Sequence, residues 1–152
     1  METTTNNCKT LAALTHLSAL SQYFFPLGNF ILPVVIWSVS RRGSEFVDDH
    51  GKQAINFQLS IFLYSLVLAI IAIPILLFTI FKNVPFSVIA DGGEFAYHLS
   101  PANITGIVII AAIAVMLFIL LKVAEFFLII FASVRAANGE PYNYPFSIKF
   151  IK

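Results

Sequence analysis

The chain has 152 residues, of which 59% are hydrophobic and 11% are charged, whereas charged residues make up about 25% of a typical soluble domain. This composition excludes an ordinary water-soluble globule and predicts an integral membrane protein. The formal net charge is +1, and no block of like charges occurs, so we expect neither a nucleic-acid-binding surface nor a polybasic lipid-binding segment. The single cysteine, Cys8, cannot form an intramolecular disulfide.

The first apolar region, residues 10–40, lacks Asp, Glu, Lys and Arg but is interrupted by the turn signal PLGN at 26–29. Its two halves, about 10–25 and 30–40, would form helices of roughly 24 Å and 17 Å, each shorter than the hydrocarbon core of a bilayer, about 30 Å. We expect a thin helical hairpin here. A re-entrant hairpin and one broken span are the alternatives.

Two further apolar regions are long enough to cross a bilayer. Residues 53–81 carry no formal charge, and Pro74 within them is expected to kink the helix. The last helix, about 100–137, contains an apolar core at 104–121. The sequence therefore predicts an all-α, integral membrane helical bundle with four transmembrane helices in a single membrane domain, the first two short and the last two long.

The distribution of Lys and Arg predicts the topology. Loop 41–52 holds three of these residues, and the C-terminal segment from Arg135 onward holds three more, whereas loop 82–99 holds only Lys82. Because an excess of positive charge marks the cytoplasmic side, loop 41–52 and the tail 138–152 are predicted to be cytoplasmic and loop 82–99 external. A hairpin at the start then places both termini on the cytoplasmic side of a bacterial inner membrane.

Polar side chains recur at helical spacing in two of the apolar regions. They lie three or four residues apart, which places each set on one helix face. Such faces bind neighbouring helices through hydrogen bonds or line a hydrated path. Without a charged relay we favour packing, with the two faces meeting inside one subunit or across a subunit boundary. These helix-packing or pathway candidates are Gln53, Asn56, Ser60 and Tyr64, together with Thr15, Ser18 and Gln22.

Lys122 and Glu125 are the only charged side chains between the apolar core 104–121 and Arg135. One helical turn separates them, so they can neutralise each other. An ionisable pair inside the hydrocarbon would be a candidate for a proton or ion path. Because a helix over 104–137 would be about 51 Å long and must leave the bilayer, we favour a paired set at the cytoplasmic interface.

Acidic residues precede the long helix, where the helix dipole favours negative charge. The simple interpretation is that they cap and anchor this helix at the interface and pair with nearby Lys and Arg. The alternative is a docking surface for a partner protein, formed together with the aromatic tail. The docking candidates are Glu45, Asp48, Asp49, Tyr142 and Tyr144.

No pattern for catalysis, metal binding or cofactor binding is found in the sequence. It has no Gly-rich phosphate loop and no GxSxG motif. His16, His50 and His98 fall on different predicted elements and lack the i,i+4 partner of a helical metal site. We therefore expect a protein that is not an enzyme and that binds no metal or cofactor.

Several segments resemble a known family. The central block reads EFVDDHGKQAINFQ at 45–58, the tail reads AANGEPYNYP at 136–145, and THLSAL at 15–20 and PLGN at 26–29 add to them. Together they resemble a bacterial family of small membrane proteins of unknown function that is grouped with the polytopic subunit of the chloroplast inner-envelope protein translocon. This resemblance implies four helices, cytoplasmic termini and no catalytic residues. Gln53 stands where many relatives have Glu.

These observations predict a small non-enzymatic accessory or assembly subunit of a larger inner-membrane complex, which the resemblance links to protein translocation. The competing class is a homo-oligomeric channel or transporter for a small solute or ion. Charged rings and paired half-helices, which are typical of conducting proteins, are missing from the sequence. The expected partners are the lipid bilayer and other membrane-protein subunits, and no nucleic acid.

Overall fold

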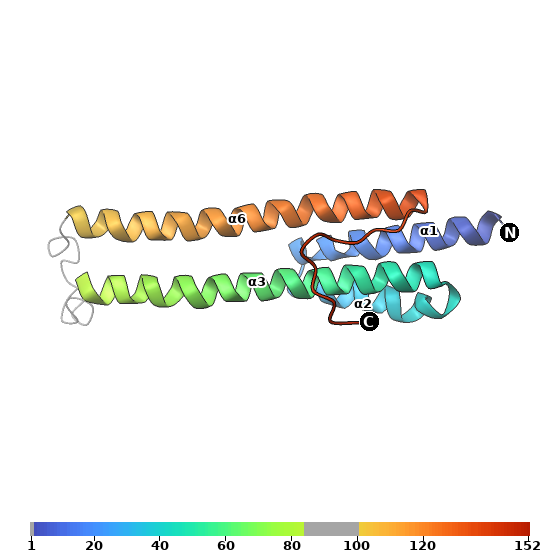
Figure 1. Cartoon of the computed structure of the whole chain (residues 1–152), viewed down its shortest axis with the longest axis horizontal. Helices are drawn as coiled ribbons and strands as arrows, with labels where there is room; N and C mark the ends of the chain where they lie inside the picture. The colour runs from blue at the N-terminus through green and yellow to red at the C-terminus, as the bar shows by residue number, and fades with distance from the viewer. Residues whose placement is uncertain (1, 84–100) are drawn as a thin grey trace. The chain divides into compact units, whose positions relative to one another are not determined.

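The computed structural model describes residues 2–83 and 101–152, and every regular element within them is helical (Figure 1). This confirms the all-α class. The predicted external loop 82–99 lies almost entirely outside the described residues. The elements are α1 (Glu2–Leu17), η1 (Ser18–Tyr23), α2 (Gly28–Ser40), η2 (Arg41–Gly43), α3 (Glu45–Asn83) and α6 (Pro101–Asn138), where η denotes a 3-10 helix.

Two helices, over Glu45–Lys82 and Thr105–Asn138, are long and apolar enough to cross a bilayer. Only 6% of the most apolar stretch of the first and 0% of that of the second is buried inside the protein. The core helix of a soluble protein would be covered, so these uncovered helices favour a lipid environment. The 13 residues of α2 extend only about 20 Å, which is less than the thickness of the hydrocarbon core, about 30 Å. The presence of four transmembrane helices therefore stays a prediction.

The chain divides into two compact units. Unit 1 comprises Met1–Leu63 and Lys122–Lys152, and unit 2 comprises Tyr64–Leu121. Unit 1 therefore contains α1, η1, α2, the first part of α3, the last part of α6 and the C-terminal tail. Unit 2 contains the remaining parts of α3 and α6.

Small side chains form a tightly packed apolar cluster in unit 1. Ala12 and Ala13 of α1 and Ala136 of α6 are buried together, and Phe46 of α3 packs against them. Small residues allow helix backbones to approach closely, which is the usual basis of helix packing in membrane proteins. α1, α3 and α6 are thus held together at this point by close packing.

The turn between η1 and α2 brings the two arms of the N-terminal hairpin into close contact. Leu27 has a left-handed backbone with φ of 61°, and Gly28 starts α2 directly after it. A Cβ atom at Gly28 would lie 2.6 Å from the carbonyl oxygen of Ser21. Only glycine leaves room for this approach, which explains why the turn signal is found here.

Gly51 of α3 is a second point of close approach, because a Cβ atom there would overlap the indole ring of Trp37 in α2. We expect Gly51→Ala to destabilise unit 1 by about 1 to 3 kcal/mol, the usual cost of overpacking. Thermal unfolding in detergent, followed by circular dichroism, measures the change. Gly43→Ala is the matched control, because nothing lies within 4 Å of its added Cβ; an equal loss in both variants would contradict the close contact.

Candidate functional site

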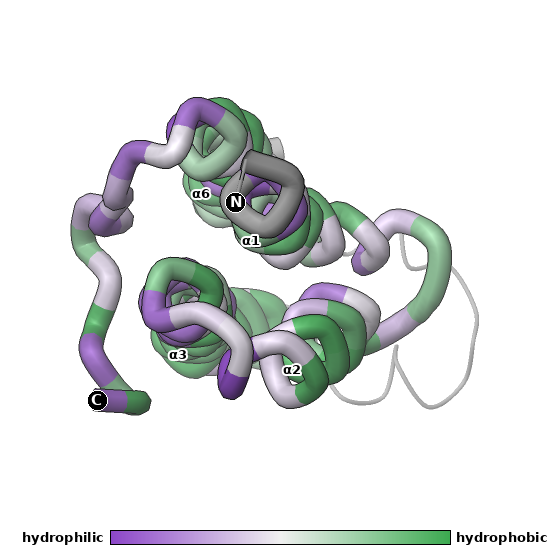
Figure 2. The backbone as a smooth tube through the Cα atoms, turned by 90° about the vertical axis from the view of Figure 1, so that its right-hand side faces the viewer, coloured by the Kyte–Doolittle hydropathy of each residue, from purple (hydrophilic) through white to green (hydrophobic). Residues whose placement is uncertain are grey.

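The C-terminal tail starts where a capping motif ends α6. Gly139 has φ of 81°, and its N–H donates to the Ala136 carbonyl at 2.9 Å. The N–H of Glu140 donates to the Arg135 carbonyl at 3.0 Å. This pair of bonds is the Schellman motif, which favours glycine at the left-handed position. It turns the chain away from the axis of α6, and the tail then passes to the side of α3 that faces away from α2 (Figure 2).

Asn56 of α3 holds the end of this tail through three hydrogen bonds. Its Oδ1 accepts from the backbone N–H of Phe150 at 3.0 Å and of Ile151 at 2.8 Å. Its Nδ2 donates to the Ile151 carbonyl at 2.9 Å. The side-chain amide therefore pairs with the backbone of the tail as a neighbouring strand would, which satisfies main-chain groups that form no helix.

The neighbouring polar residues of α3 extend this contact. The Ser60 hydroxyl accepts from the backbone N–H of Ile148 at 2.8 Å and donates to the Asn56 carbonyl at 2.7 Å. Gln53 Nε2 donates to Asn143 Oδ1 at 2.6 Å. Three of the four predicted polar residues of this helix face thus bind the tail. The fourth, Tyr64, belongs to unit 2.

Tyr144 inserts from the tail into unit 1 and ends a chain of three buried polar rings. Its hydroxyl lies 2.9 Å from His16 Nδ1, and His16 Nε2 lies 2.8 Å from His50 Nδ1. The Tyr144 ring also stacks on Phe57, with centroids 3.9 Å apart and planes 7° from parallel. This stacking and the polar contact together fix the ring of Tyr144 in unit 1.

Burial raises the pKa of the Tyr144 phenol well above its usual value, because the charged phenolate would be poorly solvated there. The phenol therefore stays protonated and can donate to His16 Nδ1. If it does so, the proton of a neutral His16 lies on Nε2 and donates to His50 Nδ1; in the other tautomer His50 Nδ1–H donates to His16 Nε2 and His16 Nδ1–H donates to the phenol oxygen. Tyr142 is the other tail tyrosine, and burial raises its pKa as well, while nearby Arg135 opposes the shift.

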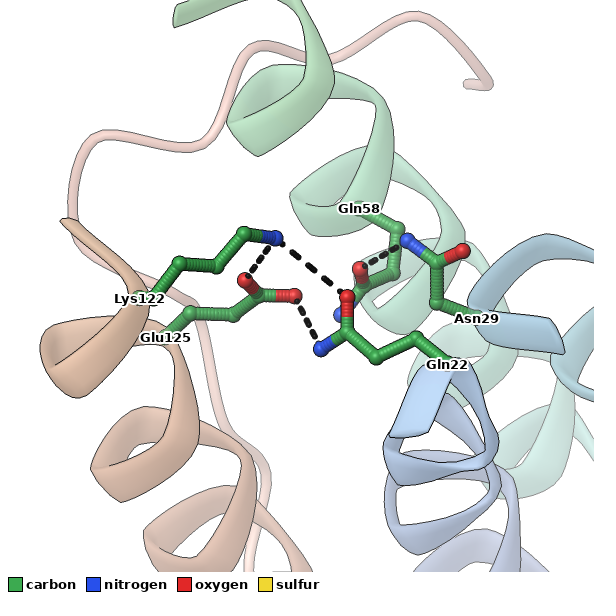
Figure 3. A network of polar contacts seen from close by, with 5 residues as sticks. All are labelled: Gln22, Asn29, Gln58, Lys122 and Glu125. Atoms are coloured by element: carbon green, nitrogen blue, oxygen red, sulfur yellow. Dashed lines mark hydrogen bonds and ion pairs between the residues drawn. The ribbon is translucent and has the colours of Figure 1, made fainter. Parts of the chain in front are cut away.

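A second polar cluster joins α6 to η1 and is shown in Figure 3. Glu125 is fully buried, and its Oε2 lies 2.8 Å from Lys122 Nζ. Gln22 Nε2 donates to Glu125 Oε1 at 3.0 Å, and Lys122 Nζ donates to Gln22 Oε1 at 3.3 Å. Beside them, Asn29 Nδ2 donates to Gln58 Oε1 at 2.9 Å. Glu125 thus lies in the interior of unit 1, and Lys122 reaches it from a half-buried position.

The two predicted polar faces have different hydrogen-bond partners. Thr15 and Ser18 donate to backbone carbonyls of their own segment, at 2.8 and 2.7 Å, and Gln22 contacts α6. The two faces have different partners because the C-terminal tail covers the polar face of α3. This tail is not helical, so helical periodicity could not predict the contact.

The predicted docking residues fall into two groups. Asp48 accepts a hydrogen bond from Trp37 Nε1 at 2.8 Å and pairs with Lys52 at 2.6 Å, so it joins α2 to α3 within the chain. Tyr144 is only 6% exposed and faces the interior. Glu45 and Asp49 are exposed and Tyr142 is half-buried, so these three residues are accessible to a partner.

The pairing of His16 with His50 was not predicted. The two residues are 34 positions apart, and no periodicity relates them. Within the described ranges, no group of three or more His, Cys, Asp or Glu side chains could hold a metal ion. The buried hydrogen bonds of unit 1 join α1 to α3, η1 to α6, α2 to α3, and the tail to α1 and α3.

A family model described as the magnetosome magnetite crystal formation protein family, MamF/MmsF, matches residues 7–151. No curated protein and no solved structure matches the chain. The family match overturns the resemblance to the translocon-related family and with it the link to protein translocation: the segments that carried that resemblance all lie inside the matched range. Because the match covers nearly the whole sequence, the chain belongs to the magnetosome magnetite crystal formation protein family.

Proposed function

We propose that this chain is a non-enzymatic assembly subunit of the magnetosome membrane, where it helps to organise the proteins that form the magnetite crystal. Membership of the family supports the magnetosome membrane as its place of action. The assembly role is supported by the hydrogen bonds of unit 1, in which polar side chains bind one another and the tail. These bonds hold segments of the chain together, and the tail covers the polar face of α3.

The apolar surface of unit 2 supports the same role. Its helices expose large hydrophobic side chains in nearly every turn, and such surfaces bind lipid or the helices of neighbouring membrane proteins. In unit 1 the polar side chains are bound within the chain, whereas in unit 2 the apolar side chains are exposed. A subunit of this kind is suited to association within the membrane. The exposed residues of unit 2 include Leu66, Val67, Ile70, Ile71, Phe78, Phe81, Val108, Ile109, Ile113, Val115 and Met116.

The test is a deletion of the gene in a magnetosome-forming cell, complemented with variants. Electron microscopy should show crystals of altered size or number in the deletion strain and normal crystals after complementation with the wild-type chain. Complementation with Asn56→Leu should fail, because the tail no longer binds. Normal crystals in the deletion strain would contradict the proposal.

The competing channel hypothesis makes a separate prediction. If Gln53, Asn56 and Ser60 bind the tail, they do not line a water path. Lipid vesicles that contain the purified protein should then release ions and small solutes no faster than vesicles without protein. A fluorescent dye-release and proton-flux assay measures this. Flux through wild-type protein that Asn56→Leu abolishes would identify a water path and contradict the assembly role.

The membrane topology can be tested by cysteine labelling in a Cys8→Ser background. We propose that the α2–α3 connection and the C-terminal tail face the cytoplasm, because Lys and Arg are concentrated there, and that the N-terminal hairpin returns the N-terminus to the same side. Single cysteines at Asn7, Ser44 and Ser147 should then react with an impermeant maleimide only from the cytoplasmic side. A cysteine at Asp91, which lies outside the described residues, should react only from the other side. External labelling at Asn7 alone would mean that the first region crosses the membrane once.

A further inference from the structure

A pocket of about 570 Å³ lies in unit 1 between the start of α3 and the C-terminal tail. This volume is within the range of small-molecule sites, about 300 to 1,000 Å³. One wall is formed by the first turns of α3, including Phe46 and Gln53, and the other by the tail, including Tyr142 and Ile151. Both walls belong to the same compact unit, and the hydrogen bonds of Asn56 to the tail hold them together.

Three lysines line this pocket, namely Lys52, Lys149 and Lys152, against a single carboxylate, Asp49. Lys52 pairs with Asp48 at 2.6 Å, and an ammonium group has further N–H donors for a second partner. In the part of the chain that the structure describes, Lys149 and Lys152 form no ion pair. Asp48 thus neutralises Lys52, whereas Lys149 and Lys152 bring two ammonium groups to the pocket beside the one carboxylate of Asp49.

Lys52 is far in sequence from Lys149 and Lys152, and the fold brings it to them. Lys52 lies on α3, whereas Lys149 and Lys152 belong to the tail, whose backbone at 148–151 is bound by Asn56 and Ser60. The sequence contains no block of basic residues, so the order of charges along the chain does not reveal this cluster. The side-chain amides of Gln53 and Asn143 add polar groups to the same lining.

The position of the pocket along α3 indicates the kind of anion. Its lining residues on this helix, from Phe46 to Asn56, cover the change from the charged first turns to the run without charges that begins at Gln53. In a membrane-spanning helix, this change occurs at the level of the lipid head groups. Basic pockets at this level bind anionic head groups, and the apolar side chains of Phe46 and Ile151 suit the glycerol and upper acyl carbons.

We propose that this pocket binds the phosphate group of an anionic phospholipid, held by Lys149 and Lys152 with Lys52 beside them. A phosphodiester offers oxygens that accept from ammonium groups. The same lysines would recognise free phosphate, so the experiment must separate the lipid from the soluble anion. The inference goes beyond the proposed assembly role and does not depend on it, because it concerns the purified protein and its lipids.

Native mass spectrometry of the full-length protein in mild detergent, titrated with dioleoylphosphatidylglycerol, tests this proposal. The wild-type protein should retain one lipid, and dioleoylphosphatidylcholine should bind more weakly. Lys149→Gln/Lys152→Gln should weaken phosphatidylglycerol binding roughly 10- to 30-fold, as the loss of two charged contacts predicts. Equal binding of this lipid by the wild-type protein and this variant would overturn the proposal.

Two controls separate charge from folding. Lys149→Arg/Lys152→Arg keeps the charge and should keep the binding, whereas Arg42→Gln/Lys82→Gln removes the same charge outside the pocket and should leave binding unchanged. Inorganic phosphate should compete only at concentrations far above those of the lipid. Phosphate that binds as tightly as phosphatidylglycerol would overturn the lipid assignment, because the acyl and glycerol groups would then contribute nothing.

Discussion

Replacing Lys122 by Met is expected to destabilise unit 1 by about 3 kcal/mol, the usual cost of leaving one partner of a buried ion pair without the other. Glu125 is fully buried, and its two oxygens are bound by Lys122 and Gln22. After the substitution, Gln22 alone remains to compensate the carboxylate. Unfolding of the purified protein by denaturant in mixed micelles, followed by circular dichroism, measures the loss.

A double variant makes this prediction specific to the ion pair. Glu125→Gln removes the buried charge but keeps a side chain that can contact Gln22, so Lys122→Met/Glu125→Gln should recover most of the stability lost in Lys122→Met. Lys82→Met, at an exposed position of α3, is the control for loss of one lysine. If the double variant were as unstable as Lys122→Met, the loss would come from the packing of Lys122 and not from the stranded carboxylate.

Asn56→Leu is expected to have a comparable effect, about 3 kcal/mol, because it removes three hydrogen bonds, leaves the Ile151 N–H without its acceptor, and leaves the Phe150 N–H with only the Ile148 carbonyl at 3.1 Å. The tail should detach, and with it Tyr144 should leave its place beside His16 and Phe57. Thermal unfolding in detergent and the susceptibility of the tail to protease measure the two consequences.

Gln58→Leu on the same helix is the matched control. Gln58 is also buried, but the structure gives it one hydrogen bond, from Asn29, and its Nε2 has no partner among the described residues. The loss of stability should therefore be about 1 kcal/mol, and the tail should stay resistant to protease. Equal loss in the two variants would mean that Asn56 stabilises the helix packing in general and not the docked tail.

Composition and periodicity were sufficient to predict the helical class, because a chain with few charges and long apolar runs has few other ways to satisfy its backbone in a membrane. The turn around Gly28 was also predictable, since proline and glycine act locally. The end of α6 at Gly139 has the same kind of local cause, because a residue with a left-handed backbone conformation, which glycine adopts easily, ends a helix.

The partners of the polar residues were not predictable in the same way. Helical spacing shows that Gln53, Asn56 and Ser60 share a face, but it does not show what covers that face. The structure gives this role to an irregular tail, whose backbone N–H groups carry no sequence signal. The contact of His16 with Tyr144 and the convergence of the lysines depend on the same tail, and the contact of His16 with His50 depends on how α1 packs on α3. The sequence alone could not predict these contacts.

The family assignment shows a related limit of short motifs. The central block and the tail resemble the translocon-related family, yet the match over residues 7–151 is to the magnetosome magnetite crystal formation family. The segments that carried the resemblance include Gly28, Gly51, Asn56, Gly139 and Tyr144, which in this structure make the turn, the helix contacts and the tail contact. Residues with such structural roles indicate how the chain folds, and they do not by themselves distinguish what it does.

The claim that the polar face of α3 binds the tail is tested most directly by hydrogen–deuterium exchange of the C-terminal peptide in the detergent-solubilised protein. The backbone amides of Ile148, Phe150 and Ile151 donate to Ser60 and Asn56, so they should exchange at least about tenfold more slowly in the wild-type protein than in Asn56→Leu. Exchange of these amides at the rate of an unstructured peptide in the wild-type protein would contradict the account.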